Sequence, residues 1–179
     1  MDNATAQNLI DLNTRFYAKH AASFSATRSA PWEGWQRVAD LARERFGDAP
    51  TSLRAFDLAC GNLRFERFLA EQLPHTSLHV TAIDNCPALA ANMNELARVD
   101  YHSADILTAL LVQSDHSCVN ANPTPQAAAL DATFPHASCD IAVCFGFMHH
   151  VPGAALRQAI LSRLIGSVCP GGIVIVSFW

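Results

Sequence analysis

The chain has 179 residues, of which 50% are hydrophobic and 16% charged, with 12 Lys and Arg residues against 16 Asp and Glu residues. This length and hydrophobic fraction predict one domain with a sizeable core and disfavour two full domains. The charged fraction is below the usual value of about a quarter. The net charge of −4 and the lack of a basic run disfavour a nucleic-acid groove built from phosphate contacts.

The first fifty residues predict a helical cap, residues 1–50. A helix is expected over residues 5–20, packed on the main body through Leu9, Leu12, Phe16 and Tyr17. A second helix is predicted from about Pro31 to Phe46, ahead of a glycine and a proline. The stretch from Phe24 to Trp35, which leads into the second helix, holds two tryptophans and an arginine and is too aromatic for a passive linker.

Residues 51–179 alternate apolar strands with helices. The strands are expected at residues 53–59, 77–84, 99–105, 139–146 and 173–179, and the helices at 63–73, 87–98 and 154–166. Residues 110–134 interrupt this alternation with prolines and small polar residues, which predict an inserted surface loop. The Pro-Gly-Gly sequence at 170–172 predicts a turn before the last strand.

This alternation is typical of an α/β fold, a three-layer doubly wound parallel sheet with helices on both faces. Right-handed crossovers predict the strand order 3-2-1-4-5. In such a sheet the ligand crevice lies at the carboxyl ends of the strands, beside the first strand, where the strand order reverses.

Three acidic residues end the first three predicted strands at this crevice: Asp57, Asp84 and Asp105. A short carboxylate such as Asp84 can accept hydrogen bonds from both hydroxyls of a ribose. Asp105 would face a base with an exocyclic amine, and Asp57 with the backbone of residues 60–62 would face the central part of the ligand. Each acid alone is better explained by a helix cap or a solvated loop, but three at successive strand ends predict a nucleoside that carries positive charge.

A dinucleotide is the weaker alternative. Its fingerprint needs G-x-G-x-x-G after the first strand, and here Gly61 is the only glycine of the turn. A pyrophosphate could not approach this turn as closely, which disfavours an NAD-dependent oxidoreductase.

The same residues carry a family resemblance. FDLACGNLRF resembles motif I of the class I S-adenosylmethionine (SAM)-dependent methyltransferases, which is usually nearer D-x-G-x-G-x-G, with Ala59 and Leu63 at two glycine positions. TAIDNC and HSADIL resemble the second and third motifs of that family, and FPHASCDIAVCFGFMHHVP and PGGIVIVSFW the motifs of strands four and five. The resemblance covers residues 51–179 and implies a Rossmann-like SAM-binding core.

The resemblance implies roles for individual residues. Asp57 and Gly61 would line the methionine portion of SAM and Asp84 its ribose. Asp105 with Ile106 would line the adenine, while Phe145 and Gly146 would pass close to the sulfonium. The full set of implied cofactor-binding residues is Tyr17, Arg28, Trp32, Asp57, Ala59, Cys60, Gly61, Asn62, Asp84, Asn85, Asp105, Ile106, Phe145 and Gly146.

The N-terminal stretch FYAKHAASFSATRSAPW resembles a segment of the methyltransferases that esterify a carboxymethyl group on the tRNA wobble uridine. In that comparison Tyr17, Arg28 and Trp32 close over SAM, with Arg28 a partner for its carboxylate. The alternative is that both tryptophans belong to the core and that Arg28 is a surface cation.

Two adjacent histidines, His149 and His150, follow the fourth predicted strand. Neighbouring residues in a loop rarely point at one ion, so no metal site is expected. Either histidine could act as a general base for a neutral oxygen or nitrogen acceptor, and a packing role is an equal alternative. A carboxylate acceptor would need no base.

We therefore predict a SAM-dependent methyltransferase that acts on a small molecule or an RNA nucleotide and yields S-adenosylhomocysteine (SAH). The family fold continues with a helix and strands six and seven, which this sequence lacks. A SAM- or nucleoside-binding module, or a catalytically incomplete methyltransferase, is the alternative. The strand 173–179 would then be an apolar edge, which predicts self-association through it.

The sequence also bears on the compartment. No apolar segment is long enough to span a membrane, and the acidic, polar N-terminus does not resemble a secretory signal. The six cysteines form no CxxC pair and several lie in apolar runs. We expect reduced, buried thiols in a cytoplasmic protein with no membrane partner.

Overall fold

The computed structural model describes residues 1–90, 98–116 and 132–178. In chain order they form α1 (Asn3–Ala26), α2 (Gly34–Phe46), β1 (Ser52–Leu58), α3 (Arg64–Gln72), β2 (Ser77–Asp84), β3 (Val99–Ser103), α4 (Ile106–His116), β4 (Cys139–Cys144), the 3₁₀ turn η2 (Met148–His150), α6 (Ala154–Ser167) and β5 (Val168–Val176). None of the helices in these ranges combines the length and the apolar character that crossing a membrane requires.

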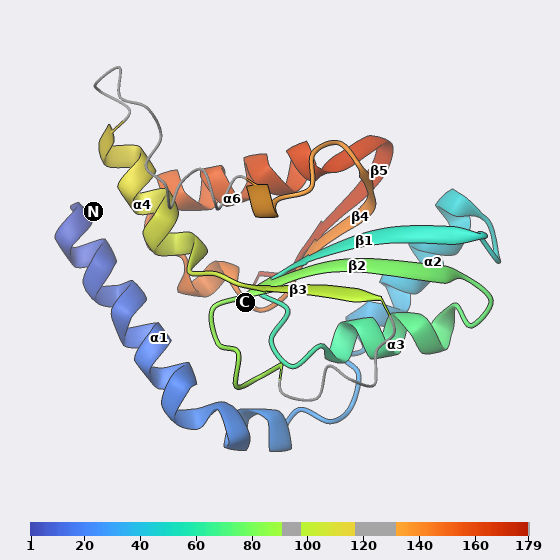
Figure 1. The fold of residues 1–179 in the computed structure, drawn as a ribbon, viewed down its shortest axis with the longest axis horizontal. Helices are drawn as coiled ribbons and strands as arrows, with labels where there is room; N and C mark the ends of the chain where they lie inside the picture. The colour runs from blue at the N-terminus through green and yellow to red at the C-terminus, as the bar shows by residue number, and fades with distance from the viewer. Residues whose placement is uncertain (91–97, 117–131, 179) are drawn as a thin grey trace.

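The five strands form one parallel sheet in the order β3-β2-β1-β4-β5, which confirms the predicted fold class and strand order. Helices α4 and α6 cover one face and α2 and α3 the other, while α1 crosses the edge where the strands end (Figure 1). Along β1, Phe56 and Leu58 pack in the core under α4 and α6, and Leu53 and Ala55 pack in the core under α2 and α3. This alternation is why β1 reads as a continuous apolar run.

The predicted loop at 110–134 is wrong in its first part, because residues 110–116 belong to α4. The helix forms because its apolar side chains recur at helical spacing and are buried against the sheet, as Ile106, Leu107, Leu110 and Leu111. A parallel β3 and β4 also need a crossover, which α4 helps to supply. Residues 117–131 of the predicted loop lie outside the described residues. So do residues 91–97 of the helix predicted at 87–98, whose first residues form a turn.

The prediction for the last strand is also wrong at both ends. The Pro-Gly-Gly sequence lies inside β5, which runs over Val168–Val176 with an irregular register opposite Cys139 and Ile141. A Cβ on Gly172 would lie 2.8 Å from the Cβ of Val168, so glycine allows the chain to pass there. β5 is half-buried, as an edge strand should be, and not fully buried.

Helix α1 is longer than predicted and presents a different face. Leu9, Leu12 and Phe16 are exposed, while the buried residues are Ala6, Ile10 and Ala21. The predicted face would pack on the main body, but α1 runs along α4 and η2 across the strand ends and buries another face. In that position a narrow row of buried residues, with polar residues beside it, is enough to hold the helix in place.

Candidate functional site

Two adjoining cavities lie where the strands end. The inner cavity holds about 740 Å³ of empty space, a volume that includes open solvent at its mouth. The outer cavity lies between the segment at 27–32 and the turn after β1. The walls shared by both cavities are Tyr17, Phe24, Ala59, Gly61, Phe145 and Gly146.

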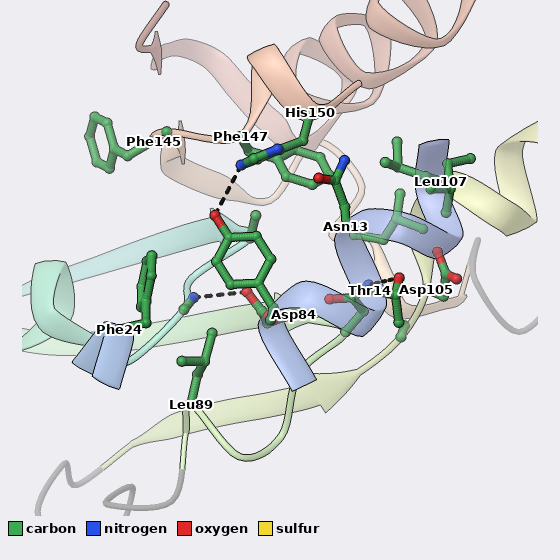
Figure 2. Close-up of a pocket in the computed structure, with 18 residues that line it drawn as sticks. Asn13, Thr14, Phe24, Asp84, Leu89, Asp105, Leu107, Phe145, Phe147 and His150 are labelled. Carbon is green, nitrogen blue, oxygen red and sulfur yellow. Dashed lines mark hydrogen bonds between the residues drawn. The ribbon is translucent and has the colours of Figure 1, made fainter. Parts of the chain in front are cut away.

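The structure brings the predicted residues together in this crevice. The inner cavity is lined by Tyr17, Ala59, Gly61, Asp84, Asn85, Asp105, Ile106, Phe145, Gly146 and His150. The remaining predicted residues line the outer cavity: Arg28, Trp32, Asp57, Cys60, Asn62 and His149. Figure 2 shows His150 and Phe147 on one side of the inner cavity and Asp84 on the other. Their roles toward a cofactor remain predictions.

The turn between β1 and α3 keeps the backbone of a glycine-rich turn with only one glycine. Ala59 and Leu63 adopt left-handed φ angles of 64° and 57°, and Gly61 one of 57°. The N–H groups of Ala59 and Cys60 both donate to the carbonyl of Ile83, at 2.8 and 3.2 Å, which holds the turn against the end of β2. Alanine and leucine are strained in this conformation, because their Cβ atoms approach the following carbonyl.

Asp84 is buried at the end of β2 and held by two backbone donors. The N–H of Gly61 donates to Oδ2 at 2.9 Å and the N–H of Cys86 donates to Oδ1 at 2.8 Å. Burial raises the pKa of Asp84, and these hydrogen bonds oppose the rise. Each carboxyl oxygen keeps a second acceptor position, so the group can still receive two hydroxyl donors from the cavity.

Asp105 caps helix α4. The N–H of Thr108 donates to Oδ1 at 3.1 Å and its hydroxyl to Oδ2 at 2.8 Å. The side chain is exposed and also lines the inner cavity, next to the buried Ile106. A helix cap therefore explains Asp105 without a ligand, and its predicted contact with adenine stays a prediction.

Asp57 is buried at 3% exposure, and behind it lies Glu66 of α3 at 1%. The two carboxyl groups lie within hydrogen-bonding reach of each other. Apart from this mutual contact, no donor among the described residues reaches Oδ1 of Asp57 or either carboxyl oxygen of Glu66. Burial and the neighbouring carboxyl hold the pKa of Asp57 well above its ordinary value, and burial raises the pKa of Glu66 to about 7. Asp57 does not cap α3, which has no side-chain cap.

Side-chain hydrogen bonds fasten the N-terminal segment over the crevice. Asn85 donates to the hydroxyl of Thr14 in α1 at 3.1 Å. Asn62 donates to the carbonyl of Arg28 at 3.3 Å, and Arg64 to that of Ala30 at 2.7 Å. The turn after β1 therefore holds both the ligand-facing backbone and the segment that covers it.

Aromatic residues form the wall of the outer cavity. Trp35 is buried and packs on Phe65 and Phe145, so it belongs to the core. Trp32 is 39% exposed and lies edge-on to Phe145, at a ring-centroid distance of 6.1 Å. The alternative of two core tryptophans therefore holds for Trp35 and not for Trp32. Arg28 is exposed and lies 3.8 Å above the ring of Phe24.

The two histidines differ in position. His150 is half-buried in the inner cavity, and its Nε2 is hydrogen-bonded to the hydroxyl of Tyr17 at 3.0 Å. His149 is exposed and its ring lies 3.9 Å from that of His150. Burial and the neighbouring histidine lower the pKa of His150, which keeps the ring neutral near pH 7. Within the described ranges, no group of three or more His, Cys, Asp or Glu residues is placed to hold a metal ion.

Sequence reasoning missed several residues of this site. Ile10, Asn13 and Thr14 line the inner cavity from α1, on the same face as Tyr17. Asn13, Thr14 and Tyr17 follow Ile10 by three, four and seven positions, a spacing that places all four on one face of a helix. The more apolar Leu9 and Leu12, which are exposed, hid this pattern in the sequence. Glu66 gave no signal, because a glutamate in the first turn of a helix is ordinary at the surface.

Comparisons with known proteins agree with this geometry. A family model described as a methyltransferase domain matches residues 56–176, which is more than half of the chain. No curated protein matches the sequence.

Solved structures share the fold at low identity. The sugar N-methyltransferase KedS8 from Streptoalloteichus has a TM-score of 0.57 and 18% identity, covering 87% of this chain and 52% of that one. SAM-bound CalS10, an amino pentose methyltransferase from Micromonospora echinaspora, has a TM-score of 0.56 and 21% identity. The match covers 90% of this chain and 56% of CalS10. DesVI from Streptomyces venezuelae has a TM-score of 0.52 and 16% identity, covering 100% and 58%. The chain spans a little over half the length of these proteins, and it belongs to the methyltransferase domain family.

Proposed function

We propose that the chain binds SAM in this crevice and transfers its methyl group to a small molecule or an RNA nucleotide, leaving SAH. The observation that carries the proposal is Asp84, a buried carboxylate oriented by two backbone N–H groups at the wall of the inner cavity. A carboxylate fixed in this way suits the vicinal hydroxyls of a ribose. The family match and the SAM named with CalS10 support the choice of cofactor.

The charges in the crevice support one orientation. The adenosine part would occupy the inner cavity, with Asp84 on the ribose and Asp105 with Ile106 on the adenine. The methionine part would extend toward Asp57 and the outer cavity, where Arg28 supplies a positive charge for the carboxylate. Asp57 lines the outer cavity and supplies a negative charge there for a cationic ligand.

When bound, SAM supplies a methyl group activated by a neutral leaving group. The chain's own residues then have to orient the acceptor and exclude water. Phe145 and Trp32 provide an apolar wall beside the meeting point of the two cavities. For a neutral oxygen or nitrogen acceptor, we assign proton removal to one of the two histidines, His149 at the outer cavity or His150 at the inner one. In His150, Nδ1 can take a proton only in the tautomer in which the Nε2–H donates to the hydroxyl of Tyr17.

Calorimetry with SAM, SAH and NAD tests the cofactor. The unaltered chain should bind SAM and SAH, and Asp84→Asn should weaken binding roughly 10- to 100-fold through the loss of a charged acceptor. Asn can still accept one backbone bond, so the variant should fold. Asp100→Asn, on the exposed side chain of Asp100 in β3, is the matched control and should bind normally. Binding of NAD without SAM would refute the proposal.

Methyl transfer separates an enzyme from a binding module. Labelled SAM would be offered with amino sugars, as the printed names of KedS8 and CalS10 suggest, and with tRNA that carries carboxymethyluridine, as the N-terminal resemblance suggests. Transfer to one class identifies the acceptor type. SAM binding with no transfer to any acceptor would favour the binding module.

Two further proposals concern the compartment of the protein and its association with itself. Cys60, Cys86, Cys139 and Cys144 are buried free thiols, which supports a reducing compartment such as the cytoplasm. β5 lies at the sheet edge with Phe178 beyond it at 65% exposure, which supports self-association through residues 173–178. Trp179, the last residue of the predicted surface, lies outside the described residues.

A further inference from the structure

The proposed SAM contacts account for Asp57 but leave its buried carboxyl partner, Glu66, unexplained. Asp57 lines the outer cavity, and Glu66 lies behind it on α3. Both side chains are at least nine-tenths buried. Buried carboxyl groups ordinarily have donors, and each exception calls for a physical reason.

Two carboxylates in contact cannot both stay ionised at low cost, because each offers only acceptors and both carry negative charge. One proton between them removes the repulsion and makes the hydrogen bond. The raised pKa values of both groups agree with a shared proton.

The neighbouring groups do not neutralise the pair by themselves. Asp84 from β2 adds negative charge, and the thiols of Cys60 in the turn and Cys144 in β4 have pKa values raised by burial and stay neutral. Arg67 of α3 is the positive group that acts on Glu66. A second positive charge is therefore most favourable on the cavity side of Asp57.

We propose that Asp57 and Glu66 form one cation receptor, which releases its shared proton to solvent when the ammonium-bearing end of the cofactor binds. Glu66 is a positioning residue in this scheme, since it acts through Asp57 and does not reach the cavity. The inference rests on the proposed SAM function. It adds that cofactor binding is coupled to proton release through a residue outside the binding wall.

The coupling has a definite sign. Below about pH 7 the pair keeps its shared proton and a single negative charge, so binding that releases this proton should weaken about tenfold for each pH unit lost. Asp84 also has a raised pKa, but it faces the ribose end. For a neutral nucleoside without the amino-acid end, Asp84 should contribute to the pH dependence of binding in the same way, whereas the Asp57–Glu66 pair should contribute nothing.

Calorimetry of SAH and of 5′-methylthioadenosine at pH 6.5, each in two buffers of different ionisation enthalpy, measures proton release. We expect SAH to release about one proton more than 5′-methylthioadenosine, and its affinity to fall more steeply between pH 7 and pH 5. Equal proton release for the two ligands would overturn the proposal. This comparison uses only the unaltered chain, so it does not depend on any variant folding.

The substitution Glu66→Gln then assigns the effect. The amide can donate to Asp57 without a shared proton, so the excess release should fall to near zero while SAH still binds. Glu71→Gln, an exposed position on the same helix, is the matched control and should leave the release unchanged. If Glu66 were only structural, Glu66→Gln would lower stability and keep the excess release. If neither SAM nor SAH binds, the proposed function itself is refuted, and this inference with it.

Discussion

The strained turn between β1 and α3 allows a prediction that separates the effect of backbone strain on stability from the effect of side-chain packing. Ala59 and Leu63 both have left-handed φ angles, of 64° and 57°, but Ala59 is half-buried and Leu63 is fully buried. The substitutions Ala59→Gly and Leu63→Gly relieve the same kind of strain, and they remove very different amounts of buried apolar surface.

The magnitudes follow from these two terms. A left-handed residue with a Cβ costs about 1–2 kcal/mol relative to glycine. Loss of the half-buried methyl of Ala59 offsets less than about 0.8 kcal/mol of this gain. Ala59→Gly should therefore stabilise the fold by about 0.5–1 kcal/mol, which raises the melting temperature by roughly 1–4 °C in a domain of this size. Leu63→Gly loses about 2–5 kcal/mol of packing and should be destabilising by roughly 2–3 kcal/mol net.

Urea unfolding of both variants, followed by circular dichroism, measures these free energies. Gly47→Ala is the control for strain alone, because Gly47 has a φ of +96° and a Cβ there would meet nothing within 4 Å. It should be destabilising by about 1 kcal/mol. Gly166→Ala, inside α6 with open space around it, should be stabilising by up to about 1 kcal/mol. Destabilisation by Ala59→Gly would refute the reasoning, since the turn would then not be strained at that position.

Three further predictions concern other parts of the molecule. Because the folded pKa of Glu66 is raised to about 7 and that of Asp57 is raised too, the folded state binds more protons than the unfolded chain between about pH 4.5 and pH 7. In urea titrations, the free energy of unfolding should therefore fall by on the order of 1 kcal/mol for each unit that the pH rises across that window. The dependence on pH should be weaker in Glu66→Gln. Tyr17→Phe should cost roughly 0.5–1.5 kcal/mol in urea unfolding by breaking the bond to His150, and an unchanged stability would count against the contact. Phe178→Lys should reduce self-association in light scattering at high concentration, and a wild-type chain that is strictly monomeric there would contradict association through β5.

The sheet and the location of the crevice could be predicted because both follow from patterns within a few residues. Apolar runs that end in an acid mark buried parallel strands, and right-handed crossovers then leave one strand order. Asp84 was predictable for this reason, since its place at the end of β2 follows from the strand itself. Trp32 and Trp35 could not be separated, because their burial depends on how α2 meets α3.

The errors share a physical origin in contacts that are distant in sequence. The exposed Leu9 and Leu12 are as apolar as the buried Ile10, and only the position of α1 across the strand ends decides which face is covered. The pairing of β5 with β4, where Gly172 passes against the carbonyl of Asp140, makes a predicted turn part of β5. Glu66 was invisible because its burial beside Asp57 depends on the docking of α3 against β1.

The distribution of charge along the crevice restricts where an acceptor can enter. The acids Asp84 and Asp105 line only the inner cavity, whereas the cation Arg28 lines only the outer one. A zwitterionic cofactor with its carboxylate at Arg28 and its ribose at Asp84 would hold its sulfonium between them, near the shared wall of Phe145 and Gly146. In that arrangement the adenosine part fills the inner cavity, so an acceptor must approach through the outer one, past Trp32. Acceptor selectivity should then change with substitutions at Trp32 while SAH affinity changes less. The opposite result would place the acceptor on the inner side, next to His150.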